Sequence, residues 1–99
     1  MRETQYSVWG WANATFGFTP NNFSKAVRAN VEMAELLTKL AADNSHPDAI
    51  EEAADVVIVL MHLAENMKKD LFMEVDRKMA INRDRRWTLD GNGHGQHIP

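Results

Sequence analysis

The sequence lacks several features that would point to particular classes of protein. It has no cysteine, which excludes disulfide bonds and thiolate metal sites. No apolar run reaches the roughly 18 residues that a membrane span needs, and the N-terminal MRETQ has no apolar signal core. The formal net charge is −3, which argues against a general polyanion binder. We therefore expect a cytoplasmic protein that binds neither polymeric nucleic acid nor a membrane.

Internal repeats and linkers are also missing, and the 99 residues are expected to form a single domain, 1–99. With 44% hydrophobic and 25% charged residues, the composition is that of an ordinary globular protein. A chain of this length builds only a modest core, so we expect it to associate with further copies of itself.

Hydrophobic periodicity predicts an all-α fold with helices at about 5–16, 22–43, 47–68 and 71–86. A Gly-rich stretch, 88–99, has no periodicity and is expected to be a flexible tail. The second predicted helix has an apolar stripe and a charged face. The stripe comprises Phe23, Ala26, Val27, Ala34, Leu37 and Ala41, and the charged face Lys25, Arg28, Glu32, Glu35 and Lys39. Because Arg28 and Glu32 form an i,i+4 pair, this face also fits simple solvation.

The third predicted helix begins with three acids, Glu51, Glu52 and Asp55, and continues directly into the apolar run VVIVLM. At about 100° per residue, Glu52 points with the apolar side and Asp55 lies one step round. Glu51 points toward His62 and Glu65, on the polar side. Charged groups beside a core are costly unless they are paired, and a metal cation is one such partner.

Two acid pairs have the spacing of a shared metal site. Glu32-x-x-Glu35 and Glu52-x-x-Asp55 each place two carboxylates on one helix face, and the short turn at 44–47 makes the two helices antiparallel neighbours. Four oxygen ligands suit Mg²⁺ or Mn²⁺ better than Zn²⁺, and such a site suits a polyphosphate substrate. Donors to the phosphates are expected from one face of the fourth predicted helix, namely Lys78, Asn82 and Arg85 or Arg86.

From Gln5 to Trp87 the sequence resembles the MazG-like all-α nucleoside triphosphate pyrophosphohydrolases. The residues that carry the resemblance are Trp9, Phe16-Gly17, the two acid pairs, and Lys78-x-x-x-Asn82-x-x-Arg85-Arg86-Trp87. The resemblance implies a four-helix MazG-like protomer in a homodimer or homotetramer, with Glu32, Glu35, Glu52 and Asp55 as ligands of Mg²⁺ or Mn²⁺. It also implies cleavage of a (d)NTP to a nucleoside monophosphate and pyrophosphate, in the host cytoplasm if a phage encodes the protein.

The short single-domain form and Asp90-Gly91 look most like the phage dATP/dGTP branch, the MazZ-type enzymes, which implies purine dNTPs as substrates. For the reaction we expect Glu35 near the attacking water and Lys78 to offset phosphate charge. Trp9, Asn13 and Phe16 would contact the base, although the same aromatic side chains fit a packing face equally simply.

Three alternatives remain open at this point. The first is a pyrophosphatase that removes non-canonical or pyrimidine dNTPs. The second is a carboxylate-bridged di-iron bundle, which would instead need Glu-x-x-His on paired helices. The third is a non-catalytic helical assembly module that uses Val56–Met61 as its interface.

Overall fold

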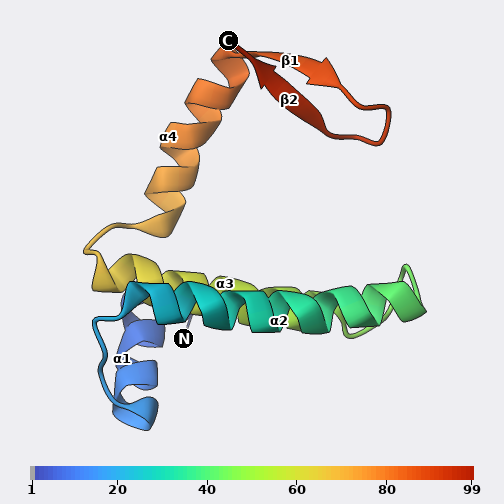
Figure 1. Cartoon of the computed structure of the whole chain (residues 1–99). Coiled ribbons are helices and arrows are strands. Elements are labelled where there is room, and N and C mark those ends of the chain that lie inside the picture. The colour runs from blue at the N-terminus through green and yellow to red at the C-terminus, as the bar shows by residue number, and fades with distance from the viewer. Residues whose placement is uncertain (1) are drawn as a thin grey trace.

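The computed structural model describes residues 2–99 and contains four helices followed by a β-hairpin (Figure 1). The elements are α1 (Gln5–Phe16), α2 (Asn22–Ala42), α3 (Ala49–Asn66), α4 (Leu71–Asp84), β1 (Arg86–Leu89) and β2 (Gly95–Ile98). The predicted helical class is confirmed, and α1 has the predicted bounds. In the described part of the chain, no helix combines the length and apolarity needed to cross a membrane.

Local capping signals set three of the four helix starts. Thr4 and Ser7 form a capping box at α1, with Ser7 N donating to Thr4 Oγ1 at 3.0 Å and Thr4 N to Ser7 Oγ at 2.8 Å. The Asn21 side chain accepts from Ser24 N at 3.0 Å at the start of α2, and the Asp70 side chain accepts from Met73 N at the start of α4. These bonds satisfy backbone donors that have no partner inside the helix.

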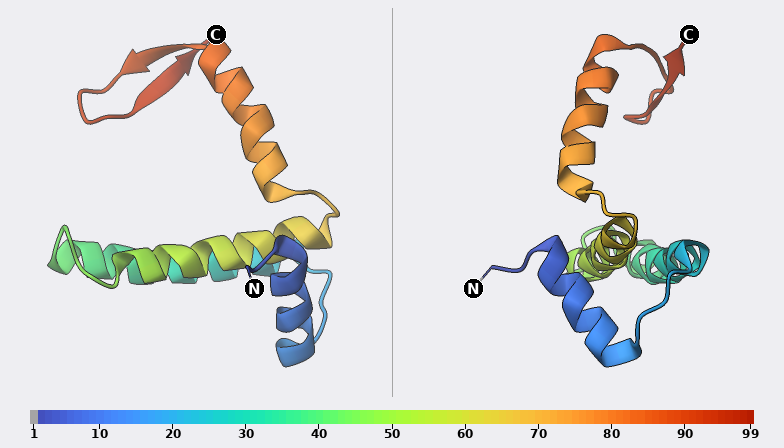
Figure 2. Two further views of the ribbon diagram at one scale, coloured as in Figure 1. Left: turned by 180° about the vertical axis from the view of Figure 1, so that it is seen from behind. Right: turned by 90° about the vertical axis from the view of Figure 1, so that its left-hand side faces the viewer.

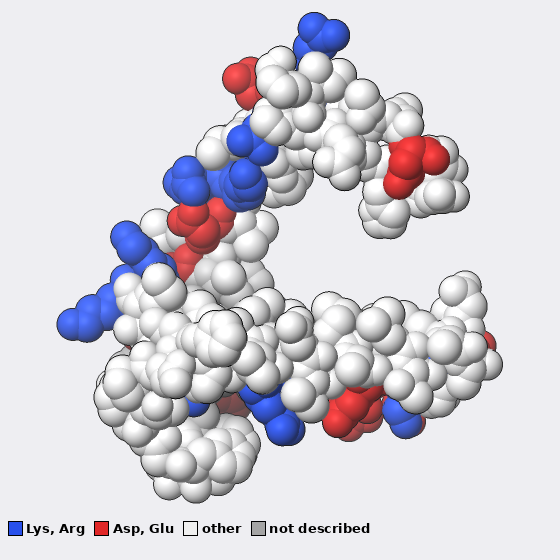
Figure 3. All heavy atoms as spheres, viewed as in Figure 1, with Lys and Arg blue, Asp and Glu red and all other residues white. Residues whose placement is uncertain are grey.

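The helices do not form a closed bundle within one chain. α2 and α3 run antiparallel, side by side, and α1 packs across α3 near the start of α2 (Figures 1 and 2). α4 leaves the opposite side of the pair and carries the hairpin at its far end, so that the space-filling view is C-shaped (Figure 3). The inner surface of the C carries few charged side chains in this view.

The face that α2 turns toward α3 differs from its predicted apolar stripe. Its less exposed residues recur every three or four positions: Asn22, Lys25, Ala29, Glu32, Leu36 and Lys39. The stripe points outward, with Phe23 79% and Leu37 61% exposed. Within one chain, therefore, α2 packs by a largely polar face and leaves its apolar side uncovered.

The contact between α1 and α3 includes two hydrogen-bonded pairs of polar side chains. Trp9 Nε1 donates to Asn66 Oδ1 at 2.9 Å, and His62 Nε2 lies 3.0 Å from Asn13 Oδ1. His62 lies on the side of α3 that was predicted to be polar, but α1 covers this side and leaves His62 only 7% exposed.

The hydrophobic core consists of small side chains. The buried apolar residues are Val8, Ala12, Ala29, Ala49, Val56 and Ala64, and α4 buries none of its residues. Large apolar side chains on α4, such as Phe72 (57%) and Met73 (69%), are exposed instead. A single chain therefore buries little apolar surface and leaves much of it exposed.

The junction between α3 and α4 is set by one left-handed residue and one amide. Lys68 has φ 57°, which turns the chain away from α3. The Gln5 side chain of α1 reaches this junction, donating to Lys69 O at 2.6 Å and to Glu65 Oε1 at 3.0 Å, and accepting from Leu71 N at 2.8 Å. The start of α4 is thereby fixed to α1.

The stretch 88–99, predicted to be a flexible tail, lies largely in an antiparallel hairpin, with Arg86 opposite Ile98 and Leu89 opposite Gly95. In the connecting turn the Asp90 carboxylate accepts from Asn92 N at 2.8 Å and His94 N at 3.2 Å. Gly91 and Gly93 supply the positive φ values that this turn needs. α4 ends two residues before its predicted end, and Trp87 Nε1 donates to Asn82 O at 3.0 Å.

Candidate metal centre

Carboxylates from α2 and α3 meet between the two helices. Glu32 on α2 and Glu52 and Asp55 on α3 each offer one oxygen, and these three oxygens lie within 4.8 Å of one another. The i,i+3 spacing puts Glu52 and Asp55 on one face of α3, and the antiparallel packing brings Glu32 opposite them. Glu51 is exposed, as the angular argument predicts.

This acid cluster contains more negative charge than the chain neutralises. Glu32 is only 7% exposed, and Glu52 Oε2 is buried with no hydrogen-bond partner among residues 2–99. The positive charge that does reach the cluster is the Arg28 guanidinium, whose Nη2 lies 2.8 Å from Glu32 Oε1. A buried, unpartnered carboxylate oxygen is costly, and an all-oxygen donor set fits Mg²⁺ or Mn²⁺. The three acids therefore fit a divalent cation.

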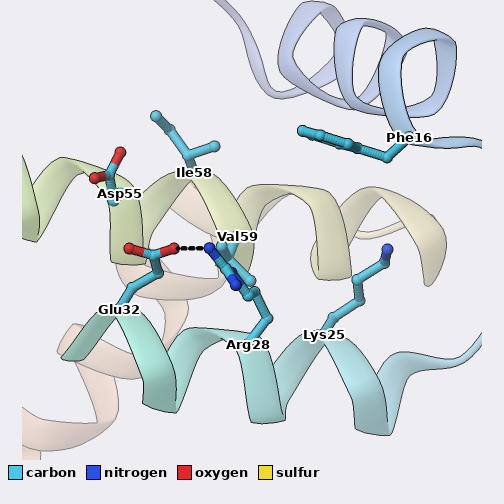
Figure 4. A pocket seen from close by; sticks show the side chains of 7 residues that line it. All are labelled: Phe16, Lys25, Arg28, Glu32, Asp55, Ile58 and Val59. Atoms are coloured by element: carbon cyan, nitrogen blue, oxygen red, sulfur yellow. Dashed lines mark ion pairs between the residues drawn. The ribbon is translucent and has the colours of Figure 1, made fainter. Parts of the chain in front are cut away.

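A cavity of about 450 Å³ opens directly beside the acids. Its walls come from three helices, and Figure 4 shows the side chains that line it: Phe16 from α1, Lys25, Arg28 and Glu32 from α2, and Asp55, Ile58 and Val59 from α3. Acidic, basic and aromatic side chains thus share one cavity. A ligand with an anionic part and a planar apolar part would find partners for both.

The fourth predicted ligand, Glu35, lies outside this group. It is exposed on α2, one turn beyond Glu32, while the other three acids converge without it. Of the predicted base contacts, Phe16 lines the cavity and is 74% exposed. Trp9 and Asn13 are half-buried in the contact between α1 and α3, where each bonds to α3.

The predicted phosphate donors lie elsewhere in the chain. Lys78 and Asn82 are on α4, Arg85 follows that helix and Arg86 opens β1. None of them lines the cavity, because α4 projects away from α2 and α3 (Figure 1). One chain therefore does not bring these residues to its own acid cluster.

Two residues that line the cavity, and one buried histidine, were not predicted as site residues. Lys25 and Arg28 precede Glu32 by seven and four positions, which is the helical spacing of one face. The signal was therefore present, but the same face also fitted simple solvation. The third residue is His62, beside Asn13. Burial lowers the pKa of His62 below its ordinary 6.5, and the positive charge of Lys25 lowers it further.

No protein-family model matches the sequence. Two characterised phage proteins do. The dATP/dGTP diphosphohydrolase of cyanophage S-2L is 38% identical over 68 residues, which are 69% of this chain and 60% of that protein. The dATP/dGTP diphosphohydrolase of Salmonella phage PMBT28 is 35% identical over 99 residues, which are 99% of this chain and 31% of that protein. The chain thus spans less than two thirds of the length of either relative.

A solved structure is similar along nearly the whole chain. It is the cyanophage S-2L MazG-like pyrophosphohydrolase bound to dGDP and three catalytic Mn²⁺ ions per active site. The TM-score is 0.76 at 28% identity, and the match covers 96% of this chain and 93% of that one. Together with the acid cluster of α2 and α3, this similarity supports a MazG-like fold for the chain and a relationship to the phage dATP/dGTP enzymes.

Proposed function

We propose that the protein is a metal-dependent nucleoside triphosphate pyrophosphohydrolase that acts on purine deoxynucleoside triphosphates, dGTP and dATP, in the cytoplasm. Water adds across the anhydride between the α- and β-phosphates and yields the nucleoside monophosphate and pyrophosphate. The observation that carries this proposal is the single cavity in which Glu32 and Asp55 lie beside Lys25, Arg28 and Phe16. The names of the phage relatives and the dGDP bound by the solved neighbour support the choice of substrate.

Glu32, Glu52 and Asp55 would hold Mg²⁺ or Mn²⁺, with Glu35 as a further ligand after rotation of its exposed side chain. The cation would supply neutralisation of phosphate charge and activation of water. Glu35 is our candidate for the group that accepts the proton of the attacking water. The Phe16 ring offers a flat apolar surface to the base, while Trp9 and Asn13 would bound the base site from α1.

We also infer that the working form is a homodimer or homotetramer. The outward apolar face of α2 and the uncovered apolar residues of α4 are surfaces that a second copy would bury. In such an assembly α4 of another copy would bring Lys78, Asn82, Arg85 and Arg86 to the phosphates. Lys78 would then act as a catalytic residue by offsetting charge that develops on the phosphates.

A panel of the eight (d)NTPs with Mg²⁺ or Mn²⁺ tests the activity, with pyrophosphate and phosphate measured separately. We expect pyrophosphate release, fastest with dGTP and dATP, and its loss in Asp55→Asn. Glu51→Gln removes an outward-facing acid of the same helix and should keep the parent rate. Phosphate as the product, or full activity in Asp55→Asn, would contradict the proposal. Preference for pyrimidine dNTPs would favour the alternative substrate class.

Mixing two inactive variants tests the contribution of another copy. Asp55→Asn disables the acid cluster and Lys78→Ala the donor on α4. If α4 serves a neighbouring copy, mixed oligomers contain some sites with both groups intact, and part of the activity returns on mixing. If the mixture stays inactive although mass spectrometry verifies subunit exchange, Lys78 does not serve the acid cluster of another copy.

A further inference from the structure

Arg28 lies at the boundary between the acid cluster and the cavity. Its Nη2 is 2.8 Å from Glu32 Oε1, and the arginine side chain is 61% exposed whereas that of Glu32 is 10% exposed. The guanidinium therefore reaches its partner from the open side of the cavity. In Figure 4 one oxygen of Glu32 meets Arg28, and the other lies toward Asp55.

This ion pair differs from an ordinary surface pair on a helix. In the usual i,i+4 pair both partners are solvated, and the pair has little effect on its surroundings. Here the carboxylate is buried and belongs to a group of three acids whose oxygens lie within 4.8 Å. A divalent cation in that group would use the same carboxylate that Arg28 now uses.

We propose that Arg28 is a substrate-positioning residue with two alternating partners. In the protein without metal it neutralises Glu32. When a divalent cation takes over Glu32, the guanidinium is released within the cavity and binds phosphate oxygens of the nucleotide, for which its planar donors are well suited. This proposal rests on the proposed function, and it makes Arg28 a competitor of the metal and a helper of the substrate.

A comparison with Lys25 distinguishes competition with the metal from phosphate binding. Lys25 lines the same cavity one turn before Arg28, but it forms no ion pair with any acid that the structure describes. Lys25 should therefore contribute to phosphate binding without competing for Glu32. Lys39 provides a matched control on the same helix, because its ion pair with Asp48 at 3.8 Å is outside the cavity.

The test compares Arg28→Gln, Lys25→Gln and Lys39→Gln, each of which removes one positive charge from α2. Binding of Mn²⁺ without nucleotide is followed by the electron paramagnetic resonance signal of free Mn²⁺, and KM for dGTP is measured at saturating Mn²⁺. Arg28→Gln should bind Mn²⁺ about three- to tenfold more tightly, because a competing cation is gone, yet raise KM about tenfold or more. Lys25→Gln should raise KM alone, and Lys39→Gln should change neither.

Unchanged or weaker Mn²⁺ binding in Arg28→Gln would overturn the competition, and an unchanged KM would overturn the role in substrate positioning. Equal tightening in Lys25→Gln would show general electrostatics instead of exchange of a partner. Arg28→Lys keeps the charge but loses the planar donors, so it should keep Mn²⁺ binding near the parent value and still raise KM. If the parent protein binds no Mn²⁺ or cleaves no nucleotide, the proposed function itself fails, which is a distinct result.

Discussion

Trp9 donates its indole N–H to the Asn66 side-chain oxygen at 2.9 Å, and this bond fastens α1 to the end of α3. The Asn66 amide nitrogen also lies 3.1 Å from Thr19 O and 3.3 Å from Asn22 Oδ1. One side chain thereby joins α1, the loop after it, the start of α2 and the end of α3. Asn66→Ala should lower the free energy of unfolding by about 1–3 kcal/mol, since it leaves the half-buried Trp9 donor without a partner. Urea unfolding measures this loss. Asn44→Ala, in the exposed turn between α2 and α3, should change little, and equal losses in both variants would contradict the assignment.

Glu52→Gln should have opposite effects with and without metal. In the absence of metal the variant loses one negative charge from the three-acid group and gains a donor where Glu52 Oε2 has no partner. We expect its melting temperature to rise by about 4–8 °C, which corresponds to roughly 1 kcal/mol for a domain of this size. The increase that Mn²⁺ gives to the parent protein should be absent in the variant. A Mn²⁺-induced increase as large as that of the parent would remove Glu52 from the ligand set.

Glu35 can be distinguished from the converged acids by comparing metal binding with turnover. Glu35 is exposed and lies outside the group of three acids. Glu35→Gln should therefore reduce the affinity for the first Mn²⁺ ion much less than Glu32→Gln does. Its kcat should nevertheless fall by about 10²-fold or more if it accepts the proton of the attacking water. Calorimetric Mn²⁺ titration and steady-state kinetics give the two numbers. Normal turnover in Glu35→Gln would exclude a role for Glu35 in proton transfer.

His62 should make the fold sensitive to mild acid. Burial and Lys25 lower its pKa in the folded protein below 6.5, so between that lowered pKa and 6.5 the unfolded chain binds more protons. Its contribution to stability is therefore fully present above pH 6.5 and decreases as the pH falls below that value. Urea unfolding at about pH 7.5 and about pH 5.5 should show a smaller difference for His62→Gln than for the parent. An identical difference would mean that other groups dominate the acid response.

Gly95 is required for the hairpin. A Cβ built at this position would lie 2.0 Å from Thr88 O, a backbone atom of the paired strand. Gly95→Ala should therefore separate β1 from β2 and remove amide exchange protection over 86–98. Exchange in α1, α2 and α3 should be unaffected in the monomer, because the hairpin packs mainly on itself. Gly10→Ala, where nothing lies within 4 Å, is the control. Protected strand amides in Gly95→Ala would contradict the pairing of Thr88 with Gln96.

Structural features that depend on residues close together in the sequence were predictable. α1 has its predicted bounds because Thr4 caps its start, and Gly17, at φ 86°, ends it. The inward direction of Glu52 and Asp55 followed from the helical period alone. These are local rules, and the chain obeys them.

Features that depend on packing partners were not predictable in the same way. A polar residue on a helix is normally solvated, whereas α1 covers His62 and supplies Asn13 as its partner. Lys25 and Arg28 escape prediction for the same reason. The apolar stripe of α2 is identifiable as a stripe, but periodicity does not say whether the surface that covers it belongs to the same chain.

The hairpin was not predicted from the sequence for a different reason. Gly91, Gly93 and Gly95 suggest irregular backbone, whereas two of them form a turn and the third permits close approach of the strands. Strands of this length also leave too little alternation to detect.

The three hydrogen bonds of Gln5 have a consequence for how sequence changes would act over distance. This amide in the first helix bonds to Glu65, Lys69 and Leu71, where α4 begins. The direction in which α4 and its hairpin extend is therefore determined in part by a residue near the opposite end of the chain. A substitution at Gln5 would leave the acids on α2 and α3 where they are. It would alter the angle at which α4 and the hairpin leave α3. Variation in α1 would then change the direction of α4 and the hairpin before it changed the acid cluster.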